Sequence, residues 1–90
     1  MMMEDQAQIL AETGMLLFGH DWQRPTARAL GAFHPNGPRD TIDDRLVRRW
    51  ATGARPIPDW AVAALISLLE ASASKIDTMK VRWKQLCPTS

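Results

Sequence analysis

Three arginines stand close together in one short segment, residues 45–53, whose sequence is Arg-Leu-Val-Arg-Arg-Trp-Ala-Thr-Gly. In a helix with 100° between residues, Arg45 and Arg48 fall on one side, and Arg49 lies at its edge. The opposite side is apolar and carries Ile42, Leu46, Val47 and Trp50. A guanidinium group donates two parallel hydrogen bonds to guanine, and an α-helix fits the major groove of DNA. The segment therefore favours a DNA-reading helix, although a helix whose arginines are merely solvated has the same pattern.

Thr41 and Asp44 form a helix-start pattern, because a threonine with an acidic residue three positions later can cap the first turn. We therefore expect the arginine helix to begin at Thr41 and to stop at Gly53, since glycine commonly follows a helix end. Arg48 and Arg45 are the expected base readers, and each bidentate pair with a base is worth about 1–3 kcal/mol of discrimination. Thr41 and Asp44 either contact bases from the first turn or only cap the helix.

Positive charge is concentrated in the centre of the chain. Residues 22–56 hold seven arginines against three aspartates, whereas residues 1–21 hold four acidic residues and no basic one. The net charge of the whole chain is only +1, so the central region is the candidate anion-binding face. A glutamine at a helix start can also donate to a phosphate with the help of the helix dipole. The residues expected to contact the DNA backbone are Gln23, Arg24, Arg28, Arg39, Arg49 and Arg55.

The composition predicts one small all-α protein without catalytic activity. Of the 90 residues 46% are apolar and none is tyrosine, and alanine, leucine, arginine and glutamate are typical of helices. Cys87 is the only cysteine, so neither a disulfide framework nor a metal site is expected. The sequence has no nucleophile–histidine pair and no glycine-rich phosphate loop, so we expect neither catalysis nor a cofactor. The absence of a long apolar run and of a signal-peptide pattern favours the cytoplasm.

Two helices are expected before the arginine helix. The first spans about residues 7–19, and the second spans about residues 22–30. Asp21 is the expected cap of the second helix, and Gly31 is its expected stop, where a positive φ is convenient. Residues 32–40 predict a loop, because two prolines and an Asn-Gly pair leave no room for regular helix. The expected total is four to five helices.

The C-terminal third predicts a long helix with an apolar seam. After a rigid turn at residues 54–58, one helix or two abutting helices are expected from Asp59 to Pro88. Residues 60–69 are apolar nearly all round, which predicts burial on more than one side. Beyond them a seven-residue period continues, which favours a seam between two copies over packing within the chain, although both remain open. The residues expected at a homodimer interface are Val62, Leu65, Leu69, Ile76, Met79, Trp83 and Leu86.

Three stretches of the chain together resemble the lambda-repressor/Cro-like helix-turn-helix superfamily, in particular small phage and proteobacterial regulators. They are residues 23–31 (Gln-Arg-Pro-Thr-Ala-Arg-Ala-Leu-Gly), residues 47–50 (Val-Arg-Arg-Trp) and residues 53–58 (Gly-Ala-Arg-Pro-Ile-Pro). The resemblance covers roughly residues 8–70. It implies a helix-turn-helix region at residues 1–58, followed by a dimerisation helix at residues 59–88.

The same resemblance implies a function. A protein of this kind would be a homodimeric transcriptional regulator that binds an inverted-repeat operator in double-stranded DNA. The expected role is repression of phage or mobile-element genes, including its own operon. The early glutamine of the family commonly touches the DNA backbone, and this role carries over to Gln23.

The turn of the helix-turn-helix motif is enlarged in this chain. Gly31 and Val47 are sixteen positions apart, whereas the family leaves about six positions between its glycine and its valine. About ten residues are therefore inserted, and they include the loop at residues 32–40. This loop either lies beside the arginine helix as a wing, with Arg39 contacting DNA, or is a surface insertion that makes no DNA contact.

A second class of function is compatible with the sequence. The apolar segment 60–69 and the seam beyond it could bind a protein partner while the arginines remain solvated. The chain would then be a helical protein-interaction module, such as an antitoxin-like or anti-CRISPR-associated regulator, with DNA binding secondary. Specific DNA binding that weakens steeply with salt would distinguish the first class from the second.

Overall fold

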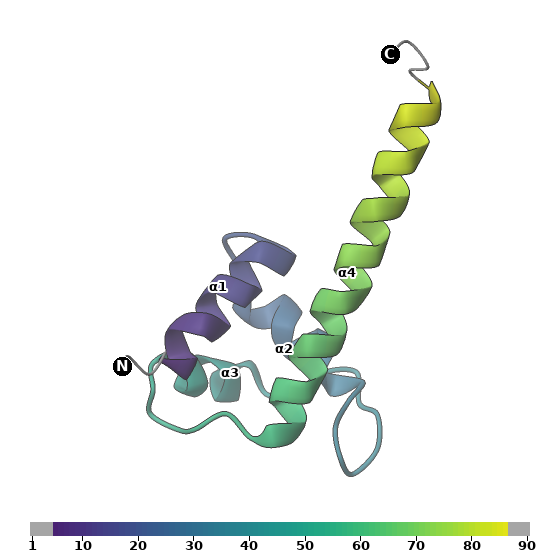
Figure 1. The fold of residues 1–90 in the computed structure, drawn as a ribbon. Helices are drawn as coiled ribbons and strands as arrows, with labels where there is room; N and C mark the ends of the chain where they lie inside the picture. The colour runs from purple at the N-terminus through teal and green to yellow at the C-terminus, as the bar shows by residue number, and fades with distance from the viewer. Residues whose placement is uncertain (1–4, 87–90) are drawn as a thin grey trace.

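The computed structural model describes residues 5–86, and within this range the chain forms four α-helices and no strand. The all-α fold expected from composition is confirmed (Figure 1). The bounds of the helices are Gln6–Phe18 for α1, Gln23–Gly31 for α2, Asp44–Ala51 for α3 and Asp59–Leu86 for α4. Cys87 and the expected helix end at Pro88 lie outside the described residues. None of the described helices is both long enough and apolar enough to cross a membrane.

Helix α1 begins at a side-chain cap and has a glycine in its middle that allows close packing. The Asp5 carboxylate accepts a hydrogen bond of 3.0 Å from the amide of Ala7, which satisfies one of the free donors of the first turn. Gly14 is buried, and a Cβ placed there would overlap the indole ring of Trp22. Trp22, only 5% exposed, therefore packs directly on the backbone of α1 and holds the first two helices together.

Helix α2 differs from the sequence expectation at both ends. Its N-cap is Trp22, which makes no side-chain capping bond, so the expectation that Asp21 caps this helix is wrong. Gly31 belongs to the last turn and does not have a positive φ, so the expected left-handed stop is also wrong. A Cβ at Gly31 would lie 2.5 Å from the carbonyl oxygen of Arg39 and 2.8 Å from the backbone of Thr41. Glycine is required there because the returning chain passes too close for any side chain.

The inserted loop between α2 and α3 leaves and returns at one point. The amide of Arg39 donates to the carbonyl of Gly31 at 2.8 Å, which closes the neck of the loop. Just beyond the neck, the amide of Ile42 donates to the carbonyl of Ala27 at 3.0 Å. Residues 32–40 therefore form a loop whose two ends lie close together. The contact between α3 and α2 does not depend on the length of this loop.

Helix α3 begins at Asp44, three residues later than the expected start at Thr41. Asp43 is the N-cap, and its carboxylate accepts a 2.9 Å hydrogen bond from the amide of Arg45. At the other end Gly53 has φ 79°, which only glycine adopts without strain. The Ala54 amide donates to the carbonyl of Arg49 at 2.9 Å, as in a Schellman motif. The expected stop at Gly53 is thus confirmed.

One apolar core joins all four helices. The first half of α4 shares this core with the helix-turn-helix region, so residues 1–58 and 59–88 do not have separate interiors. Residues 60–69 bury only one side, because Ala63 is exposed and Ile66 is 53% exposed, and the expectation of burial on several sides is wrong. The second half of α4 runs past the other helices (Figure 1). The buried apolar residues of the core are Leu10, Trp22, Ala27, Leu30, Ile42, Val47, Trp50, Ile57, Ala61, Ala64 and Leu65.

Candidate nucleic-acid interface

Helix α3 has one fully buried side and one side that presents arginines to solvent. Val47 and Trp50 are 0% and 2% exposed, and they fix the helix on the core together with Ile42 just before it. The side chains of Arg45 and Arg48 are 77% and 60% exposed. The opposed faces expected from the sequence are therefore present, and the two expected base readers project from a helix that cannot rotate without exposing its core residues.

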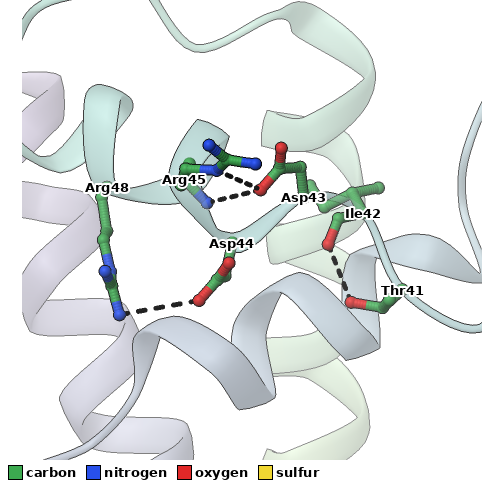
Figure 2. A network of polar contacts seen from close by, with 6 residues as sticks. All are labelled: Thr41, Ile42, Asp43, Asp44, Arg45 and Arg48. Carbon is green, nitrogen blue, oxygen red and sulfur yellow. Dashed lines mark hydrogen bonds and ion pairs between the residues drawn. The ribbon is translucent and has the colours of Figure 1, made fainter.

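Each of these two arginines is paired with an aspartate at the start of the helix. Figure 2 shows Arg45 beside Asp43 and Arg48 beside Asp44, and in both pairs a guanidinium nitrogen lies 3.6 Å from a carboxylate oxygen. Exposed ion pairs contribute little to stability, so both guanidinium groups can exchange their aspartate for another acceptor at low cost. Both aspartates thus lie beside the expected readers as acceptors that can be exchanged.

Asp43 has a second role as the cap of α3. The hydrogen bond from the Arg45 amide, with the nearby charges of Arg45 and Arg49, holds the pKa of the Asp43 carboxyl below its usual value of 3.8. The carboxylate is therefore ionised at neutral pH and can cap the helix and pair with Arg45 at once. Sequence reasoning gave Asp43 no capping role, because the Thr41–Asp44 spacing offered a competing pattern.

The amino end of α2 lies next to the arginine face of α3. Gln23 and Arg24 line a surface hollow together with Arg48, which comes from α3. A neighbouring hollow contains Arg24 and Arg28 from α2 on one side and Asp43 and Asp44 on the other. The structure thus brings expected backbone contacts from α2 beside an expected base reader from α3.

The other expected backbone contacts lie elsewhere. Arg55 lines a hollow with residues 5–7 at the start of α1, apart from the α2 side chains. Arg39 stands at the neck of the inserted loop and is exposed. Arg49 is exposed on α3, close enough to Asp43 to affect its pKa. Of the backbone residues expected from the sequence, Gln23 and Arg24 line a hollow with Arg48, and Arg28 lines the neighbouring hollow.

Thr41 does not lie on the first turn of α3. The residues Thr41, Ile42 and Asp43 lead into the helix without being part of it, and the Thr41 hydroxyl donates to the carbonyl of Ile42 at 2.8 Å (Figure 2). The cause is Ile42, which must reach the core and bond to Ala27 and so cannot stay in a helical turn. The expectation that Thr41 caps the arginine helix is wrong. Its side chain remains exposed at the edge of the Arg24–Arg28 hollow.

The inserted loop packs against α4 through a histidine that sequence reasoning did not assign. The ring of His34 lies 5.5 Å from that of Trp60 in the first turn of α4, and Trp60 in turn meets Trp50 of α3 edge-on at 6.4 Å. The His34 ring is oriented by the amide of Asn36, which donates to Nδ1 at 3.1 Å. An isolated histidine in a loop gave no sequence signal for this contact. Contact of Arg39 with DNA stays a prediction.

The expected interface residues divide into two groups along α4. Leu65 is 8% exposed and belongs to the core of its own chain, while Val62 and Leu69 are partly buried and line a groove against α1. The groove itself was not expected, since it depends on how α1 lies along α4. The second group is exposed to solvent, with exposed fractions between 48% and 74%, and consists of Ile76, Met79, Trp83 and Leu86.

Within residues 5–86 no three His, Cys, Asp or Glu side chains are grouped so that they could hold a metal ion. No protein-family model, curated protein or solved structure matches the chain. The geometry of α2, α3 and α4 is therefore what bears on the function of the protein.

Proposed function

We propose that this protein binds double-stranded DNA sequence-specifically through α3 and regulates transcription. The observation that carries the proposal is the joint placement of three features: exposed Arg45 and Arg48, a fully buried opposite side of α3, and the amino end of α2 beside Arg48. If the arginines of α3 were only solvated, no neighbouring helix would have to present its amino end beside them. A helix that reads bases does need such a neighbour, because phosphate contacts at that amino end fix the register of the reading helix in the groove.

The proposed binding mode assigns a role to each side chain. Helix α3 enters the major groove, and Arg45 and Arg48 leave their aspartates to donate to O6 and N7 of guanines. The amino end of α2 lies at a phosphate, where the side chains of Gln23 and Arg24 and the helix dipole favour the negative charge. Asp44, released from Arg48, then accepts from a cytosine amino group.

The proposed biological role follows the resemblance to lambda-repressor-like regulators. The protein would act in the cytoplasm as a homodimer on an inverted-repeat operator, with half-sites about one helical turn of DNA apart. Repression of phage or mobile-element genes, including the gene for the protein itself, is the role proposed. Its support is the same constellation of α2 and α3 landmarks, Gln23, Ala27, Gly31 and Val47.

The test begins with selection of bound sites from a random pool of duplex DNA, followed by titration of the selected site at several salt concentrations. We expect an inverted repeat with guanines in each half-site, and an affinity whose logarithm falls linearly with the logarithm of the salt concentration. Arg45→Ala and Arg48→Ala should each cost about 1–3 kcal/mol of discrimination at a guanine position.

The matched control is Arg55→Ala, which removes the same charge from an exposed site away from the α2–α3 hollows. It should weaken binding to all sequences alike, or not at all, and leave the selected site unchanged. Specific binding that survives the double substitution Arg45→Ala plus Arg48→Ala would contradict the assignment of the readers. A selection that yields no preferred site would contradict the proposed function.

One observation favours a second candidate, a helical protein-interaction module. The far half of α4 exposes large apolar side chains, among them Trp83 at 63%, and such a surface is typical of a contact site. In that case DNA binding would be weak and indifferent to sequence. The selection experiment separates the two candidates, since only the first predicts a common site.

A further inference from the structure

An apolar groove runs between α1 and the first half of α4. It is shallow and open to solvent, with a volume of about 210 Å³. Ile9 and Thr13 form its α1 side, and Val62, Ile66 and Leu69 form its α4 side. Ile9 is 42% exposed and Ile66 is 53% exposed, so much of this apolar surface is in water in the single chain. We call this feature the α1–α4 groove.

The far half of α4, residues 75–86, carries an apolar stripe that continues the buried face of the near half. Ile76 and Trp83 follow Val62 and Leu69 at intervals of seven, and the companion row runs from Leu65 through the polar Ser72 to Met79 and Leu86. In the near half this face contacts the core, whereas in the far half no other helix of the chain covers it (Figure 1). We call Ile76, Met79, Trp83 and Leu86 the distal stripe.

The charges around the groove and the stripe are opposite in sign. Glu12 is the one charged residue of α1, and it is exposed three positions from Ile9 on the same side of the helix. The distal stripe is flanked by four exposed basic residues against the single Asp77: Lys75, Lys80, Arg82 and Lys84.

We infer that two copies of the chain pair through antiparallel α4 helices, so that the distal stripe of each copy lies in the α1–α4 groove of the other. A two-fold axis level with residue 74 along α4 brings Met79 opposite Leu69 of the second copy, and Trp83 opposite Leu65. The stripe then fills the groove, and the basic flanks lie on the side of Glu12 of α1. Because the interface is symmetric, every contact occurs twice.

The middle of α4 suits such a crossing. Between the groove and the distal stripe the seam position is Ser72, a small residue seven positions after Leu65 and seven before Met79, which allows two helix backbones to approach closely. The helix contains neither glycine nor proline, so it is not interrupted where the copies cross. A parallel pair would instead bring the basic residues of both copies side by side and leave the α1–α4 groove empty.

The first test measures the mass of the full chain in solution, without DNA, over a range of concentrations. We expect a dimer that Met79→Asp dissociates, with a rise in the dissociation constant of roughly 30-fold or more, since an apolar contact is lost twice. The matched control is Val81→Asp. Val81 is 52% exposed on the same half of α4, but it points away from the distal stripe, so this variant should remain dimeric. Circular dichroism checks that both variants keep the helices of the body.

The second test determines the orientation of the pair by disulfide trapping in a Cys87→Ser background. A mixture of a Leu69→Cys protein and a Met79→Cys protein should form a cross-linked heterodimer under mild oxidation. Met79→Cys alone should not cross-link with itself. Cross-linking of Met79→Cys to itself but not to Leu69→Cys would show a parallel pair and overturn the inference.

A monomeric wild type would overturn the inference as well, and so would equal effects of Met79→Asp and Val81→Asp. The inference rests on the homodimer of the proposed function but not on DNA binding. Mass and cross-linking are measured without DNA, whereas the site selection reports on α3. The two proposals can therefore fail separately.

Discussion

At Gly14 a neighbouring side chain, rather than the backbone conformation, requires glycine. In an exposed helix interior, replacing glycine by alanine stabilises by about 1 kcal/mol. Here the added methyl group would overlap Trp22, which is buried and has no room to retreat. We predict that Gly14→Ala destabilises the fold by about 1–3 kcal/mol, the usual cost of overpacking. Thermal unfolding followed by circular dichroism measures this effect.

Gln8→Ala is the control for that substitution, because Gln8 is exposed on the same helix. It should leave the melting temperature unchanged or raise it slightly. A loss of 1 kcal/mol lowers the melting temperature of a domain of this size by about 4–8 °C, which is easily resolved. A higher melting temperature for Gly14→Ala would contradict the packing of Trp22 described above.

Asp43 should make the stability of α3 depend on pH. The pKa of its carboxyl is lowered from 3.8 in the folded protein, first by the hydrogen bond from the Arg45 amide. The charged form is therefore favoured by folding, so its contribution is present above pH 3.8 and is lost as the pH falls through the folded-state pKa. We predict that Asp43→Asn, which keeps a capping oxygen, is less stable than the wild type near neutral pH and equally stable in strong acid.

Thermal unfolding of both proteins across the acid range measures that difference. Asp40→Asn is the control, since Asp40 is an exposed aspartate that caps no helix. Its difference from the wild type should not follow the same pH dependence. If the gap between wild type and Asp43→Asn stays constant from neutral pH to strong acid, the capping carboxylate does not have the role assigned to it.

For single residues, the sequence predicted the features that depend on spacing along a helix. It missed the features that depend on close contact between different helices. The arginine face of α3 follows from helical periodicity, so the exposure of Arg45 and Arg48 on one side of the helix could be predicted in advance. The cap could not, because Thr41 and Asp43 are both acceptable capping residues. What decides between them is the bond from Ile42 to Ala27, a contact between different helices. The roles of Gly14 and Gly31 depend on contacts across helices in the same way.

Among the elements, the inserted loop is the one that can be changed without moving the others. Its neck is closed by the bond between Arg39 and Gly31, and Thr41 passes within van der Waals reach of Gly31. We predict that replacing residues 33–39 by two glycines, the second of which supplies the neck amide in place of Arg39, leaves the helix content intact and shifts the melting temperature by only a few degrees, because loop length has a weak effect on stability. Circular dichroism and thermal unfolding measure both quantities.

The same variant tests whether the loop is a wing. If Arg39 contacts a phosphate, the shortened protein should bind the selected operator with a salt slope smaller by about one, and Arg39→Ala should reproduce that change. If the loop makes no contact, both variants should bind as the wild type does. Loss of cooperative unfolding in the shortened protein would contradict the independence of α3 from the loop, and would assign a structural role to His34 and Trp60.

For the whole molecule, the sequence predicted the order and type of the elements but not their arrangement. Four helices, the loop and the long last helix follow from local patterns. The α1–α4 groove does not, because it depends on how two helices lie against each other, and no periodicity encodes that. The segment 60–69 illustrates the limit: its composition predicted burial on several sides, yet in a chain of 90 residues only one side has a neighbour.

The uninterrupted length of α4 has a consequence for which DNA sites the protein would accept. In the proposed pair, the stretch of helix between the core and the two-fold axis is a rigid spacer that sets how far apart the two α3 helices stand. Seven residues more or fewer in that stretch change the spacer by about 10 Å in each copy, the length of about three base pairs. The gap between operator half-sites would then be encoded in the length of a helix that never touches DNA.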